Sequence, residues 1–126
     1  MKVLYHKDTG ELELSGTDRE LRDLAARLRS GRGRIPLDVG GDPAPYDKAL
    51  PAIEFERTEG NLMISYLSDR DALRIEGGAE ELEVFASVLE EFGDEGDITA
   101  HIHVEHVPGH EYLSPRTEPL VIALNA

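Results

Sequence analysis

The chain lacks cysteine and tryptophan, and its basic residues are scarce beside its acidic ones. Without cysteine it has no disulfide framework, zinc finger, iron–sulfur cluster or thiol nucleophile. Only 13 Lys and Arg stand against 26 Asp and Glu, so the formal net charge is −13 over 126 residues. Such a surface disfavours nucleic acid and anionic membranes as partners, and it favours a basic partner. No apolar run approaches the ~18 residues of a membrane span, and no signal segment opens the chain, so we expect a cytoplasmic protein.

The charge that is present is unevenly distributed. Residues 1–60 carry 10 basic and 12 acidic side chains, whereas residues 61–126 carry 3 basic and 14 acidic ones, giving net charges of −2 and −11. Such asymmetry indicates two surfaces with different roles. The alternative is that the acidic half is only a solvated face that keeps the protein soluble.

The chain also repeats itself. An offset of 61 aligns Val3–Leu28 with Ile64–Leu89 without a gap, and 8 of the 26 pairs are identical. With small gaps the likeness continues, because Leu37-x-Val39 matches Ile102-x-Val104 and Pro51–Phe55 matches Pro119–Ala123. We therefore predict one domain over residues 1–126 that is built of two repeats, residues 1–60 and 61–126.

Each repeat has the pattern expected of a β-β-α-β-β unit. Alternating apolar residues predict strands, and longer apolar stripes with helical spacing predict one helix per unit. The ranges expected as strands are 2–6, 11–15, 62–67, 72–76, 98–105 and 119–124, and the second helix is expected over about 79–92. Neither unit is large enough to bury much alone, so both should share one core. The predicted fold class is α+β, with two tandem units related by pseudo-twofold symmetry, a largely antiparallel sheet and two helices.

The first helix has a clear start signal. Thr17-x-x-Glu20 is the pattern of a capping box, in which the two side chains accept hydrogen bonds from free backbone N–H groups. Gly31 and Gly33 are expected to stop this helix.

The two helices differ in charge and in one pair of positions. Residues 17–34 hold six arginines, and residues 78–97 hold eight acids and no base, so the helices should attract each other if they lie side by side. Val84 and Val88 replace Asp23 and Arg27 of the first helix. This additional apolar strip needs cover from the other half of the chain or from a second chain, and we expect cover within the chain.

Histidines gather near the end of the chain. On a strand, His101, His103 and Glu105 project from one face while the intervening Ile102 and Val104 point into the core. That is the spacing of a His/His/carboxylate metal site, to which His110 could add a ligand. A polar strand face or a contact surface gives the same pattern. The first repeat carries Pro36, Asp38 and Gly40 at the positions that this alignment matches, so the pattern does not predict a metal in both halves.

Catalytic patterns are missing. No serine stands beside an obvious base, and no glycine-rich phosphate loop occurs. We therefore expect no enzymatic activity and no cofactor.

The segment from His101 to Val121 resembles the signature of bacterial immunity protein family 32. The features that carry the resemblance are His101 and His103 with Glu105, then Pro108-Gly-His110, Tyr112-Leu-Ser-Pro115 and Glu118-Pro-Leu-Val121. His106 departs from the pattern, which has an aromatic residue there. The resemblance implies a small intracellular inhibitor that protects a bacterial cell from a polymorphic toxin.

The resemblance and the charge together favour a toxin-binding protein. We predict that its acidic second half docks on a basic surface of a cognate toxin and that the protein is a monomer or a homodimer. A separate hypothesis is a structural or regulatory oligomer with Val84 and Val88 at the dimer seam. The predicted partner-binding residues are His103, Glu105, His110, Glu111 and Tyr112, with Tyr112 as an aromatic anchor. The alternative function is a metal-binding module or metal-dependent enzyme that uses His101, His103 and Glu105.

Overall fold

The computed structural model describes residues 1–106 and 112–125, which form nine strands and two helices. In chain order the elements are β1 (Lys2–Tyr5), β2 (Leu12–Gly16), α1 (Asp18–Arg29), β3 (Arg32–Pro36), β4 (Lys48–Ala49), β5 (Ala52–Arg57), β6 (Met63–Leu67), β7 (Ala72–Gly77), α2 (Ala79–Glu95), β8 (His101–Val104) and β9 (Leu120–Leu124).

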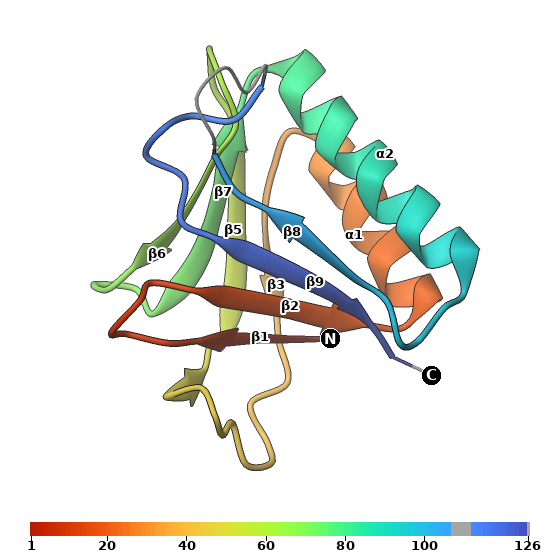
Figure 1. Cartoon of the computed structure of the whole chain (residues 1–126). Helices are drawn as coiled ribbons and strands as arrows, with labels where there is room; N and C mark the ends of the chain where they lie inside the picture. Colours follow the sequence, from red (N-terminus) through yellow and green to blue (C-terminus); the bar gives the residue numbers. More distant parts are fainter. Residues whose placement is uncertain (107–111, 126) are drawn as a thin grey trace.

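These strands form two sheets, and the two helices lie together on one side of them (Figure 1). Sheet A has the order β4-β1-β2-β9-β8, and sheet B has the order β3-β5-β7-β6. In Figure 1 the strands of sheet A run across those of sheet B, and α1 and α2 lie next to each other along one side. One hydrophobic core includes Leu14 of sheet A, Phe55 of sheet B, Leu24 of α1 and Phe85 of α2. The predicted α+β class is therefore confirmed.

Each sheet contains strands from both halves of the chain. The halves meet where β2 pairs in parallel with β9 and where β5 pairs in parallel with β7. In the first pairing Leu12 lies opposite Leu120, and in the second Ile53 lies opposite Leu73. The remaining strand pairs are antiparallel.

The hairpins at the start of each half share one register. Val3 lies opposite Leu14 in β1 and β2, and Ile64 lies opposite Ile75 in β6 and β7, as the offset of 61 requires. β1 and β2 correspond to β6 and β7 under this offset, and in the strand orders β1-β2-β9-β8 and β6-β7-β5-β3 the strands β9 and β8 take the places of β5 and β3 at larger offsets. The pseudo-twofold symmetry itself stays a prediction.

The later part of the sequence alignment is wrong by several residues. β3 runs over Arg32–Pro36 and ends before Leu37-x-Val39. Ile35 lies opposite Ile53, as Val104 lies opposite Leu120, so Ile35 corresponds to Val104. The shift arises because β3 follows α1 almost directly, whereas residues 96–100 separate α2 from β8. The structural counterparts of His101 and His103 are thus Arg32 and Arg34, not Pro36 and Asp38.

The ends of the helices follow local chemistry. The capping box of α1 is confirmed, because the Thr17 hydroxyl accepts from the Glu20 N–H at 3.2 Å and the Glu20 carboxylate accepts from the Thr17 N–H at 2.9 Å. Gly33 does not stop α1 but lies in β3, where a Cβ would come within 2.8 Å of the Phe55 ring. α2 extends three residues beyond the expected end, to Gly96 with φ +69°. Among the described residues, neither helix has the length and apolarity to cross a membrane.

Candidate partner-binding surface

The two helices are joined by ion pairs across their contact. Arg29 of α1 donates from Nε to Glu83 at 2.7 Å and from Nη2 to Glu90 at 2.7 Å. Hydrogen bonds from Arg29 lower the pKa of both carboxyl groups. Arg22 pairs with Asp94 further along the same contact. The expected attraction between the arginine-rich and the acidic helix is confirmed.

A second face of α2 carries exposed carboxylates. Helical spacing places Glu80, Val84, Val88, Glu91 and Glu95 on one face, which we call the α2 outer strip. Its carboxylates at 80, 91 and 95 are exposed, and within residues 1–106 and 112–125 no ion pair holds them. Val84 is 42% exposed and Val88 is half-buried. The expectation that the chain itself covers this strip is therefore wrong for Val84.

The histidine strand alternates as predicted. His101 and His103 are exposed, Ile102 is half-buried and Val104 is buried, since β8 lies with one face over the core. Glu105 follows the strand and is exposed. β8 is the last strand of sheet A and, among the residues that the structure describes, pairs with β9 alone.

The metal hypothesis gains no support from this geometry. In the part of the chain that the structure describes, no three His, Asp or Glu side chains gather in a way that could hold a metal ion. This includes His101, His103 and Glu105, whereas His110 lies outside the described residues.

Of the remaining predicted contact residues, the structure describes Tyr112 alone. His110 and Glu111 lie outside the described residues. Tyr112 is half-buried and packs against the core, and burial raises the pKa of its hydroxyl. Its carbonyl accepts from the Leu62 N–H at 2.7 Å, beside β6 of sheet B. The structure thus exposes His103 and Glu105 at β8 and places Tyr112 next to the other sheet.

An ion-pair cluster on the outer face of sheet B escaped the sequence reasoning. Glu54 is only 7% exposed, and its Oε2 lies 2.8 Å from Arg70 Nε and 3.6 Å from Arg34 Nε. Arg74 pairs with Glu56 at 2.8 Å and thereby lowers the pKa of that carboxyl. These side chains line a hollow of about 430 Å³. Two arginines stand two positions apart in β3, and two glutamates do so in β5. This pattern predicts ion pairs only once the two strands are known to lie side by side.

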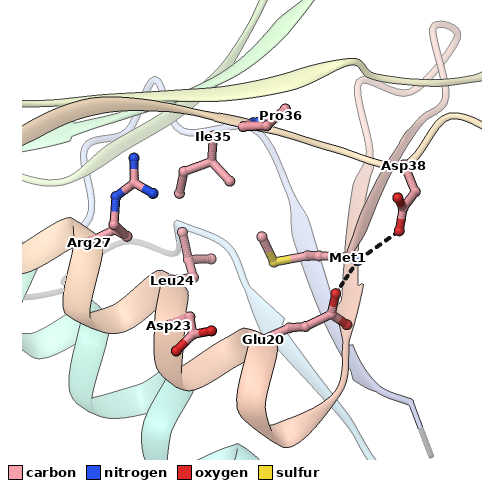
Figure 2. Close-up of a pocket in the computed structure, with 8 residues that line it drawn as sticks. All are labelled: Met1, Glu20, Asp23, Leu24, Arg27, Ile35, Pro36 and Asp38. Atoms are coloured by element: carbon pink, nitrogen blue, oxygen red, sulfur yellow. Dashed lines mark hydrogen bonds and ion pairs between the residues drawn. The ribbon is translucent and has the colours of Figure 1, made fainter.

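A second hollow, of about 290 Å³, lies between α1, β3 and the start of the chain (Figure 2). The Met1 amine lies 2.6 Å from a Glu20 oxygen and 3.1 Å from an Asp38 oxygen. Asp23 and Arg27 of α1 line it together with Ile35 of β3.

Comparison with protein families adds one finding to this geometry. Residues 72–125 match the family model of Immunity protein 32. The resemblance stated for His101–Val121 is therefore confirmed and extends toward the N-terminus. Comparison with curated proteins and with solved structures gave no match.

The Immunity protein 32 match takes in the elements that carry the exposed acidic surface. It spans β7, α2, β8 and β9, whereas β5 and β2, to which β7 and β9 pair, lie outside it. The matched segment therefore contains the α2 outer strip and the exposed histidines of β8.

Proposed function

We propose that this protein is an immunity protein that binds a cognate toxin in the cytoplasm and neutralises it through the acidic second half. The observation that carries the proposal is the Immunity protein 32 match over residues 72–125. The same half has a net charge of −11 and holds the α2 outer strip.

The strip fits a basic protein surface. The three exposed carboxylates of the α2 outer strip have no ion partner among the described residues. Those of Glu83, Glu90 and Asp94 are paired with Arg29 and Arg22 of α1. Complementary charge speeds association and excludes wrong partners more than it adds affinity. Inhibition of this kind requires only that the protein cover the toxin, so it needs no catalytic group.

Co-expression with the toxin of the adjacent gene tests this proposal. The wild-type protein should restore growth and form a complex at low salt. A variant with Glu80→Lys, Glu91→Lys and Glu95→Lys should fail to restore growth, because the toxin would meet like charge.

The matched control carries the same charge change on the first half. Asp8, Asp23 and Glu59 are exposed and have no ion pair within the described residues, so their replacement by lysine should leave rescue intact. If the wild-type protein gives neither rescue nor a complex, the proposed function is wrong.

A further inference from the structure

The four edges of the two sheets are protected to different degrees. A sheet edge presents unpaired backbone groups, which proteins usually cover, shorten or guard with charge and proline. The edge of β6 is covered by residues 112–118, since Ser114 N–H donates to Leu62 at 2.7 Å and Glu118 N–H donates to Ile64 at 2.8 Å. β4 has only two residues. β3 carries Arg32, Arg34 and Pro36.

In the part of the chain that the structure describes, the edge of β8 is neither covered by another segment nor guarded by lysine, arginine or proline. Its sequence, His101-Ile-His-Val104, contains no lysine, arginine or proline, and within the described residues only β9 pairs with it. Among the described residues, the second edge of this four-residue strand therefore has no paired neighbour.

At two positions α2 carries apolar side chains where its counterpart α1 carries charged ones. Asp23 and Arg27 of α1 line the hollow next to Ile35 of β3, as Figure 2 shows. The offset of 61 places Val84 and Val88 at these positions of α2, and strand pairing places Val104 where β3 has Ile35. Figure 1 shows β8 at the edge of sheet A on the side of the helix pair, and residues 96–100 join it to the end of α2. Ile98, between α2 and β8, is 55% exposed.

We propose that the free edge of β8 and the α2 outer strip form one docking surface for an extended basic segment of the toxin. The segment adds to β8 as a further strand, so backbone hydrogen bonds contribute affinity and alternate side chains contribute specificity. Its apolar side chains pack on Val84 and Val88, and its basic side chains meet the carboxylates of Glu80, Glu91 and Glu95. This proposal rests on the proposed function, because the occupant is the toxin.

The charge of the strip decides between this occupant and a second copy. Pairing of two β8 edges would bring together two halves of net charge −11, each with three exposed carboxylates on the helix beside the edge. Like charges at close range oppose such a dimer, whereas a basic segment relieves the same repulsion.

An exchange of residues between the helices tests the apolar part of the surface. The variant Val84→Asp/Val88→Arg gives α2 the residues of α1 and leaves the net charge unchanged. Neither position is buried, so the variant should fold, which circular dichroism and the melting temperature verify. Its affinity for the catalytically inactivated toxin of the adjacent gene should fall at least about tenfold, because two contact side chains are lost.

The control variant makes the reverse exchange. Asp23→Val/Arg27→Val alters the corresponding flank of α1, also without a change in net charge. It should bind the same toxin within about twofold of the wild-type affinity, since this flank lies outside the proposed surface.

Backbone hydrogen exchange tests the strand addition. The amides of His101–Val104 should include ones that exchange more slowly in the complex than in the free protein, while those of Arg32–Pro36 should be unchanged. Unchanged exchange in β8, or equal affinities of the two exchange variants, would overturn the docking surface even if the toxin binds and growth is rescued. A dimer that the Val84→Asp/Val88→Arg variant dissociates would assign the surface to a second copy instead. Failure of the wild-type protein to bind the toxin at all would count against the proposed function.

Discussion

The outer faces of the two sheets bury side chains of opposite polarity at corresponding positions. In sheet B Arg34 lies opposite Glu54, and in sheet A His103 lies opposite Val121 at the corresponding place. Glu54 and Val121 are both 7% exposed. One face therefore buries a carboxylate held by guanidinium groups, whereas the other buries an apolar side chain.

This contrast shows that the availability of a carboxylate for recognition depends on whether an arginine pairs with it, and less on the net charge of the chain. Arginines form ion pairs with Glu54 and Glu56 of sheet B and with Glu83 and Glu90 of α2. The carboxylates of the α2 outer strip have no such partner among the described residues. The α2 outer strip thus gathers three exposed carboxylates without ion partners in this part of the chain on one helix face, whereas Asp8, Asp23 and Glu59, which also have none there, lie on separate elements.

The largest effect should come from the core residues that the helices share. Phe85 and Leu24 hold corresponding places and are at most 1% exposed. Phe85→Ala should lower the free energy of unfolding by about 4 kcal/mol and Leu24→Ala by about 3 kcal/mol, because each leaves a cavity. Urea unfolding followed by circular dichroism measures both values. A loss below about 1 kcal/mol for either variant would show that its helix does not contribute to a common core.

A smaller effect should follow from exchanging the residues of the two outer faces. Val121→Glu should cost about 3 kcal/mol, because it buries a carboxylate without the arginines that hold Glu54. Glu54→Val should stay within about 1 kcal/mol of the wild type, since Arg34 and Arg70 are more than half exposed and stay solvated when the carboxylate is removed.

Transplanting the arginine sharpens this comparison. Adding His103→Arg to Val121→Glu should recover part of the lost stability, as a double-mutant cycle by urea unfolding would measure. If Val121→Glu and Glu54→Val cost the same, the two faces do not differ in the way described.

The helix contact should contribute modestly and in a pH-dependent way. Arg29→Met should lower the melting temperature at pH 7, whereas Arg19→Met, at an exposed position without an ion pair in the described part of the chain, should not. Arg29 lowers the folded-state pKa of Glu83 and Glu90 below the usual 4.5. Their contribution is therefore present above pH 4.5 and is lost as the pH falls through the lowered pKa. Thermal scans across this range should show the wild type and Arg29→Met converging.

The smallest effect concerns the segment that covers β6. Burial raises the pKa of Glu118, although its carboxylate accepts from the Tyr66 N–H at 3.2 Å. Ionisation in the folded state therefore costs stability at neutral pH, and the cost disappears as the pH falls through the raised pKa. Glu118→Gln keeps an acceptor for Tyr66 and should raise the melting temperature slightly at pH 7 but not at about pH 4. A lower melting temperature at pH 7 would contradict this.

Local patterns predicted the first part of each half well. The capping box at Thr17, the first two strands of each half and the alternation in β8 all depend on neighbouring residues, whose spacing the sequence displays. The position of β3 was wrong because a gap of uncertain length follows each helix. A shift of this kind changes which residues share a face, so the cluster around Glu54 was missed.

The candidate surface was predicted in part for a related reason. His103 and Glu105 are exposed as expected because strand alternation is local. Whether a valine on α2 is covered depends on elements far away in the chain, and Val84 proved exposed. The free edge of β8 could not be foreseen, since the strand order across both halves decides it.

The parallel pairing of β2 with β9 also sets the order in which the protein can assemble. It places Leu12 opposite Leu120, so β2, which leaves the ribosome early, can pair with β9 only when nearly the whole chain has been synthesised. At bacterial rates of synthesis this interval is on the order of 10 s. During it, sheet A lacks β9 and the core residues Leu120 and Ile122, so the nascent chain exposes a strand edge and apolar surface until synthesis is nearly complete.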